Sequence, residues 1–240
     1  MLQDVKGYLI GSKHEVARQA NIQKLLDQLP QLSFVEAIYP SNTKIPFKAQ
    51  LIELSYQRTG HALSNGELGC LLTHRKIWRL IANQKIHPNQ HYLILESDSN
   101  IVNIDRLCQH FMELSNQFDI FFWGAWEGHM KLYKSTINKG LNGIHFGQAY
   151  LKSVYCTYGY ALSPVAAQLL LQRTNKIAYP VDQFKHWIAE NELRIGGTQT
   201  EIISTIGKKQ SYIQHNRHFL REFFWWIVLD FKNSIICYFK

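Results

Sequence analysis

The stretch HYLILESD, residues 91–98, decides the fold of this chain. Its first five residues contain no turn former, which predicts a strand buried on both faces of a sheet. Two acidic residues, Glu96 and Asp98, follow at the carboxyl end of that strand, where open α/β sheets bind their ligands. Alternate residues of an extended segment point the same way, so the two carboxylates can converge on one cation. Oxygen ligands favour Mg²⁺ or Mn²⁺, often shared with substrate phosphates. A solvated acidic turn is the alternative.

Strand and helix signals alternate on both sides of this stretch. Further strands are predicted over residues 5–10, 33–39, 119–123 and 154–162, and helices over 14–29, 64–82, from about 104 to 114, and from 164 onward. Ser64 and Glu67 fit a capping box, and Ser163-Pro164 fits an N-cap followed by proline at the first helical position. The alternation predicts one α/β domain with a mostly parallel sheet over residues 1–207, followed by a tail over residues 208–240.

Composition favours a folded cytoplasmic protein. The chain has 240 residues, of which 46% are hydrophobic, enough for a large core. Its four cysteines are widely spaced and form no C-x-x-C pair, which favours reduced thiols over disulfides or a zinc site. The N-terminus does not fit a secretory signal, and no apolar stretch is long enough to span a bilayer.

The tail predicts contact with a membrane surface. The chain has a formal net charge of +8, and residues 208–240 hold six basic and two acidic residues beside the apolar run FFWWIVL at 223–229. Basic and aromatic residues side by side are typical of a helix lying in the interface of an anionic membrane. A helix packing its aromatic side chains on the core is the alternative. The chain contains no nucleic-acid-binding motif, so we expect no nucleic-acid partner.

Four sequence blocks occur in an order that resembles a known family. They are GELGCLLTHRKIW at 66–78, LILESD at 93–98, TYGYALSPVAAQLLL at 157–171 and PVDQF at 180–184. Together they resemble glycosyltransferase family 25, the bacterial lipooligosaccharide sugar transferases. The resemblance implies a GT-A fold, a UDP-sugar donor (often UDP-galactose, with glucose as the other hexose considered) and a divalent metal. It also implies a lipooligosaccharide acceptor, a role in lipopolysaccharide biosynthesis and a peripheral position on the inner face of the bacterial inner membrane.

The chain departs from the family pattern in two places. The family usually has Glu-Asp-Asp where this chain has Glu96-Ser97-Asp98, so the middle carboxylate is missing. If Ser97 replaces a working ligand, the affinity for metal should be lower. The family also follows its first strand with Asn-Leu and a pair of arginines. Here the sequence at 9–12 is LIGS, and Arg18 lies downstream.

The chemistry of sugar transfer assigns roles to several acidic residues. A divalent ion bridging two phosphates stabilises the charge that develops on a nucleotide diphosphate leaving group. Asp98 is the first candidate ligand and Glu96 the second, although Glu96 could instead bind a donor hydroxyl. Inversion also requires a base on the opposite face of the sugar. Asp182 is the leading candidate and Glu127 the second. The alternative for Asp182 is a helix N-cap.

Four further residues are assigned to the sugar-nucleotide pocket because they lie in the matching blocks. They are His74, Arg75, Gly159 and Tyr160. His74 shares a helix side with Glu67, for which we favour the capping role. Arg75 could neutralise phosphate, although a solvated basic face is the commoner outcome. Tyr158 or Tyr160 could stack on a sugar ring, and core packing fits them as well.

Two rival functions follow from the same residues. The first is a non-catalytic binding protein, a degenerate transferase fold that recruits partners through its basic tail. Ser97 in the acidic triplet favours it. The second is a nucleotidyltransferase, which would usually carry a glycine-rich phosphate loop near the N-terminus. Gly7 and Gly11 are too sparse for such a loop.

Overall fold

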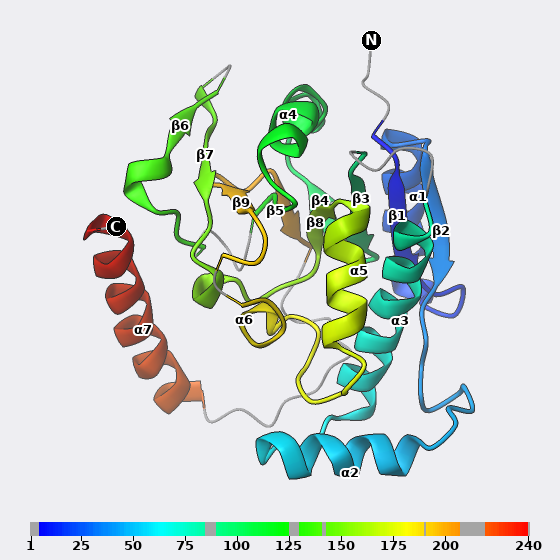
Figure 1. Cartoon of the computed structure of the whole chain (residues 1–240). Helices are drawn as coiled ribbons and strands as arrows, with labels where there is room; N and C mark the ends of the chain where they lie inside the picture. Colours follow the sequence, from blue (N-terminus) through cyan, green and yellow to red (C-terminus); the bar gives the residue numbers. More distant parts are fainter. Residues whose placement is uncertain are drawn as a thin grey trace.

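The computed structural model describes residues 5–84, 90–124, 130–140, 143–189, 191–206 and 219–239, with side chains from residue 227 onward in the last segment. Within these residues the chain forms an α/β structure around a sheet of eight strands in the order β2-β1-β3-β8-β5-β9-β7-β6 (Figure 1). The strands are β1 (Gly7–Gly11), β2 (Leu32–Glu36), β3 (Tyr92–Glu96), β5 (Ile120–Phe122), β6 (Asn138–Lys139), β7 (His145–Gln148), β8 (Gly159–Leu162) and β9 (Ile195–Thr198).

The sheet is mixed, with one direction prevailing. β1 pairs in parallel with β2 and β3, and β5 pairs in parallel with β9, whereas β8 runs antiparallel between β3 and β5. β7 also runs against its neighbours β9 and β6. Six of these eight strands therefore run the same way, which confirms the predicted α/β class. A separate antiparallel pair joins β4 (Ser99–Ile101) to β10 (Ile203–Thr205).

Two helices, α3 and α5, begin where the local sequence predicts them. Ser64 N–H donates to Glu67 Oε2 at 2.8 Å and Glu67 N–H donates to Ser64 Oγ at 3.2 Å, so the predicted capping box is confirmed. Ser163 Oγ accepts from Ala166 N–H at 3.2 Å at the start of α5. The helices are η1 (Val16–Arg18), α1 (Gln19–Gln28), α2 (Lys48–Thr59), α3 (Asn65–Ala82), α4 (Ile104–Gln117), η2 (Lys134–Thr136), η4 (Leu151–Ser153), α5 (Pro164–Arg173), α6 (Phe184–Trp187) and α7 (Phe219–Phe239).

The core is centred on β3, as its sequence predicts. Leu93, Ile94 and Leu95 are fully buried, so this strand is covered on both faces. α3 and α5 pack against each other over the sheet, as Figure 1 shows. All four cysteines are free thiols. Among the described residues, no helix has the length and apolar character that crossing a membrane requires.

The register of β1 and β3 sets the position of the site. Ile10, near the carboxyl end of β1, lies opposite Glu96, the last residue of β3. Because the two strands are parallel and adjacent, the segments that follow them leave the sheet at the same edge. Residues 11–18 and 96–98 are thereby brought together, although about 80 positions separate them in the sequence.

Candidate functional site

A cavity of about 360 Å³ opens at this edge of the sheet. Its walls are the end of β1, η1 with the turn before it, the segment after β2, the first half of α3, and the end of β3. The lining residues are Ile10, Gly11, Glu15, Arg18, Ala37, Ile38, Tyr39, Pro40, Ser41, Asn65, Gly66, Cys70, Thr73, His74, Glu96, Ser97 and Asp98. A volume of this size is typical of small-molecule sites.

Gly69 allows α3 to approach the wall of this cavity. A Cβ atom at Gly69 would collide with the Ile38 carbonyl and the Pro40 ring. The Thr73 hydroxyl, one turn later, accepts a hydrogen bond from Ile38 N–H at 2.9 Å. The close approach and this hydrogen bond together fix the segment after β2 against α3, so the cavity has a rigid side.

Glu96 is held by hydrogen bonds from two other elements. His74 Nε2, on α3, lies 3.2 Å from Glu96 Oε1, and the Thr157 hydroxyl donates to the same oxygen. Burial acts to raise the pKa of Glu96, but these two donors and the positive charge of Arg18 outweigh it, so the pKa is lowered. Glu96 is therefore ionised and fixed in position.

The protonation of His74 follows from its other neighbours. Trp78 Nε1 is only a donor, and it donates to the Tyr160 hydroxyl at 2.9 Å. The Tyr160 O–H is then free to donate to His74 Nδ1, at 2.8 Å. With Nδ1 accepting, the ring proton lies on Nε2 and donates to Glu96. Trp78, Tyr160, His74 and Glu96 thus form one chain of hydrogen bonds that orients the carboxylate.

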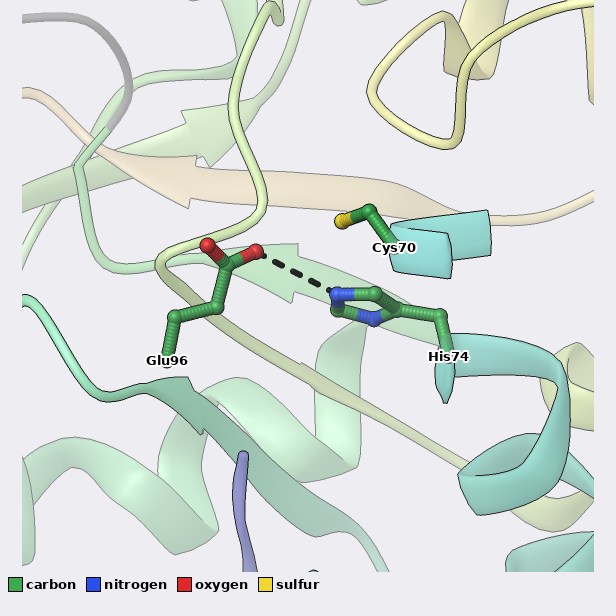
Figure 2. Close-up of side chains that lie close together, drawn as sticks. All are labelled: Cys70, His74 and Glu96. Atoms are coloured by element: carbon green, nitrogen blue, oxygen red, sulfur yellow. Dashed lines mark hydrogen bonds and ion pairs between the residues drawn. The ribbon is translucent and has the colours of Figure 1, made fainter. Parts of the chain in front are cut away.

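Figure 2 shows Cys70 beside this chain, with its sulfur facing His74 and Glu96. Cys70 Sγ, a nitrogen of His74 and an oxygen of Glu96 lie within 4.8 Å of one another, and such a mixed donor set would suit zinc. In the arrangement seen here, His74 and Glu96 bond each other, and burial with the nearby carboxylates raises the pKa of the Cys70 thiol well above its usual range. The three side chains form a hydrogen-bonded cluster, and a metal ion bound there would have to displace the contact between His74 and Glu96.

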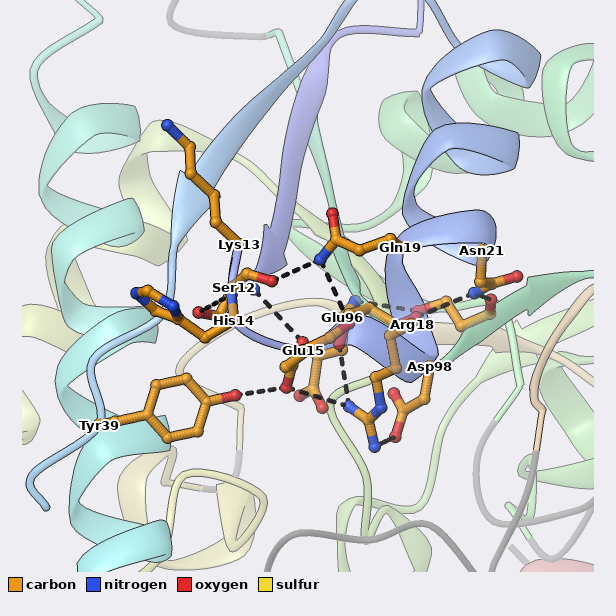
Figure 3. Close-up of polar contacts among 12 residues, drawn as sticks. Ser12, Lys13, His14, Glu15, Arg18, Gln19, Asn21, Tyr39, Glu96 and Asp98 are labelled. Atoms are coloured by element: carbon orange, nitrogen blue, oxygen red, sulfur yellow. Dashed lines mark hydrogen bonds and ion pairs between the residues drawn. The ribbon is translucent and has the colours of Figure 1, made fainter. Parts of the chain in front are cut away.

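Arg18 connects the first helical turn to the acidic triplet, as Figure 3 shows. Its guanidinium donates to Ser97 Oγ at 2.9 Å and to Asp98 Oδ2 at 3.2 Å, and it lies 3.7 Å from Glu15 Oε1. Its side chain is only 8% exposed. Ser97 thus occupies the position of the family's middle carboxylate as an uncharged acceptor for Arg18. The Asn21 amide donates to the carbonyl of Ser97 and holds the same turn in place from α1.

Asp98 is the less satisfied of the two predicted carboxylates. Arg18 holds Oδ2, but Oδ1 is buried and has no hydrogen-bond partner among the described residues. Burial, with repulsion from Glu96, raises the pKa of Asp98 to about 6. An unpaired carboxylate oxygen beside a second carboxylate is suited to receive a cation, so Glu96 and Asp98 fit the predicted hard metal ion.

Asp182 lies in the turn before α6, outside the residues that line the cavity, and its charge is coupled to Glu96 and Glu67. Burial, then repulsion from Glu96 and Glu67, raises its pKa to about 7. Its Oδ1 is buried without a partner among the described residues. Gln183 is the N-cap residue of α6, and no side chain caps that helix. The alternative role of Asp182 as an N-cap is therefore wrong.

Comparison with known proteins agrees with this arrangement. The model of glycosyltransferase family 25, described as an LPS biosynthesis protein, matches residues 5–185. The chain belongs to glycosyltransferase family 25. No curated protein sequence matches it. The matched range contains β1, Arg18, the acidic triplet, His74 and Asp182, so the cavity and its polar groups lie wholly within the family region. This family-25 chain is accordingly a glycosyltransferase of lipopolysaccharide biosynthesis.

The structure places the remaining predicted residues of this family-25 site as follows. Arg75 does not reach the cavity: its guanidinium bonds the Leu171 carbonyl at 3.1 Å and Asn175 Oδ1 at 3.0 Å, at the end of α5. Tyr160 is fully buried and serves the His74 network, so the predicted stacking on a sugar is wrong for it. Gly159 is buried in β8 beside it. Glu127 lies outside the described residues.

Sequence reasoning missed the role of Arg18. Arg18 belongs to no recognisable motif in the sequence. The one feature that could have drawn attention to it was its position after the first predicted strand, where the family carries basic residues. Its partners are about 80 positions away, so no local pattern connects them. The buried chain from Trp78 to Glu96 was missed for the same reason.

Proposed function

We propose that this protein transfers a hexose, most simply galactose or glucose, from a UDP-sugar to a lipooligosaccharide acceptor with inversion at the anomeric carbon. The observation that carries the proposal is the cavity at the carboxyl ends of β1 and β3, where Arg18, Glu96 and Asp98 converge. Nucleotide ligands of open α/β sheets bind at this edge. The family assignment supplies the reaction class, and the cavity supplies a matching place for the donor.

Arg18 supports binding of the donor diphosphate. A guanidinium presents donors in a planar fork that matches phosphate oxygens, and it remains charged in a buried site. Arg18 lines the cavity and is fixed by Ser97 and Asp98. The uncharged Ser97 leaves Arg18 less neutralised than an aspartate at that position would. We expect its remaining positive charge to face the two phosphates of UDP.

A divalent cation, Mn²⁺ or Mg²⁺, is part of the proposal. Asp98 would be the first ligand through its unpaired Oδ1, and Glu96 the second, after releasing one of its present donors. When bound, such an ion would act as a Lewis acid toward the departing diphosphate. The cavity residues bind and orient the donor, and Arg18, beside Asp98, offsets negative charge on the diphosphate.

Asp182 is the proposed base for the acceptor hydroxyl. As the acceptor oxygen attacks the anomeric carbon, its proton passes to the Asp182 carboxylate, and the bond to the diphosphate breaks with its electron pair leaving on UDP. A base with a pKa close to the working pH transfers protons most efficiently, and burial raises the pKa of Asp182 to about 7. Glu127 is the second candidate.

The acceptor places the proposed reaction at a membrane. Lipooligosaccharide is lipid-linked, so we propose that the protein is peripheral on the inner face of the bacterial inner membrane and has an anionic membrane surface as a partner. The formal net charge of +8 supports attraction to anionic lipid.

The test is a panel of UDP-sugars assayed for release of UDP with a lipooligosaccharide acceptor, with and without Mn²⁺. We expect one hexose donor to be used, and Asp182→Asn to lower kcat by about 100-fold or more. Asp105→Asn is the matched control and should remain active, because Asp105 is an exposed carboxylate on α4 and does not line the cavity. Release of UDP from no donor would refute the transferase. If calorimetry nevertheless detected binding of UDP with Mn²⁺, the protein would be a non-catalytic binding protein of the transferase fold, the alternative that Ser97 favours.

A further inference from the structure

The C-terminal helix α7 presents its polar side to the protein and its apolar side outward. Asn233 and Cys237 are 5% and 4% exposed, and Asp230 faces the same way in an ion pair with Lys131. These three residues are spaced by three and four positions, so they form one side of the helix. The side of α7 that contacts the protein is therefore a polar or small-residue face.

The opposite side of α7 is an apolar stripe. Phe231 is 68% exposed and Phe239 is 82% exposed, and Ile235 lies between them on the same face. The stripe consists of Ile227, Val228, Phe231, Ile235 and Phe239, all of them exposed, and Tyr238 lies at its edge, where Lys134 contacts its ring. A helix at the surface of a water-soluble domain normally has the reverse arrangement, with its apolar side on the core. A continuous exposed apolar patch marks a surface that contacts something else.

Specific contacts hold α7 in this orientation. Lys131 Nζ lies 3.0 Å from Asp230 Oδ1, and Lys134 Nζ lies 3.7 Å from the centre of the Tyr238 ring. α7 also contacts η2 and η4, and Figure 1 shows it at one side of the molecule, away from the cluster of α1, α3 and α5. The outward direction of the apolar stripe is thus set by contacts at two points along the helix.

Exposed basic residues lie beside the stripe. Lys134 on η2 reaches the ring of Tyr238, and Lys232 lies on α7 itself. Two copies of the chain packed stripe to stripe would bring these like charges together, which opposes a dimer. An anionic lipid surface would instead attract them and accept the apolar side chains beneath its headgroups.

We propose that α7 is the membrane-docking element, lying in the headgroup region of an anionic bilayer with the apolar stripe inserted and the flanking lysines on lipid phosphates. This inference rests on the proposed membrane location and names the surface of the protein that would contact the membrane. It does not depend on which sugar is transferred.

The experiment is co-sedimentation of the full chain with vesicles of phosphatidylcholine, with or without phosphatidylglycerol. Replacing Phe231 and Ile235 by Ser should weaken binding to the anionic vesicles by about 100-fold, because two large apolar side chains no longer leave water. The matched control replaces Met112 and Val165, which are 52% and 62% exposed on α4 and α5, by Ser and should bind like wild type. Added salt should also weaken binding.

Three results would overturn the proposal. One is equal vesicle binding by the stripe variant and wild type. Another is equal wild-type binding to vesicles with and without phosphatidylglycerol. The third is a wild-type dimer in analytical ultracentrifugation that ignores vesicles and that the stripe variant abolishes, which would make a second copy the occupant. The vesicle assay contains no sugar donor, so its result does not depend on catalysis. A protein that binds vesicles but transfers no sugar would refute the proposed reaction and leave the membrane-docking proposal intact.

Discussion

Tyr160→Phe removes a single hydroxyl from the centre of the buried hydrogen-bond chain. The change leaves the Trp78 N–H without its acceptor at 2.9 Å and His74 Nδ1 without its donor at 2.8 Å. A buried polar group without a partner costs about 1–3 kcal/mol. Because the two groups share one site and can rearrange together, we expect a total loss of about 2–4 kcal/mol in the free energy of unfolding. The ring itself keeps its packing, so the effect isolates the hydrogen bonds.

Urea denaturation, followed by tryptophan fluorescence, measures this loss. Tyr56→Phe is the matched control, because Tyr56 is 55% exposed and the same change should alter stability by less than about 0.5 kcal/mol. A loss for Tyr160→Phe equal to that of the control would show that the chain from Trp78 to Glu96 is not formed. The reasoning on the His74 proton would then fail with it.

Three further predictions concern the charged groups. Arg18→Gln should raise the KM for the donor by about 10–100-fold with a smaller effect on kcat, and Arg18→Lys should restore part of it; steady-state kinetics checks this. Asp182 holds its proton to about pH 7 in the folded protein but not in the unfolded chain, so its contribution to stability falls as pH rises toward that value. The stability of Asp182→Asn relative to wild type should therefore increase between about pH 4 and about pH 7 in urea titrations and level off above that. Glu96→Gln should cost about 1–2 kcal/mol of stability, whereas Asp98→Asn should cost less, because burial and repulsion from Glu96 already oppose the Asp98 charge that pairs with Arg18, and should still remove activity.

The central strand and the starts of two helices were predictable from the local sequence. The capping box at Ser64 and Glu67, the Ser163-Pro164 helix start and the uninterrupted apolar run of β3 each depend on neighbours within a few positions. At these positions the local preference and the tertiary packing favour the same backbone conformation, so the prediction from local sequence holds in the folded protein. α2 was less clear from the sequence. Its N-cap residue is Phe47, in a left-handed conformation and without a side-chain cap, so the usual start signal is missing.

The candidate site was predictable only in part, because its residues come from distant segments. Glu96 and Asp98 were visible together at the end of one strand. Their partners were not: Arg18 lies on η1, and His74 reaches Glu96 from α3. The assignment of Arg75 failed for a related reason. Membership in a helix block says nothing about which side of the helix a residue occupies, and Arg75 turns toward the end of α5.

The structure makes the two carboxylates of the triplet unequal, and this inequality bears on function. Two fixed donors lower the pKa of Glu96 against the effect of its burial, whereas burial and repulsion from Glu96 raise the pKa of Asp98 to about 6. A pair of groups whose surroundings move their pKa values apart is characteristic of an active site. Glu96 is held ionised by donors from two other elements. Asp98 is held by Arg18 through one oxygen, and its other oxygen is buried without a partner among the described residues. This difference supports the proposal that a cation, if bound, takes Asp98 as its first ligand, because positive charge at the second oxygen would offset both the burial and the repulsion from Glu96.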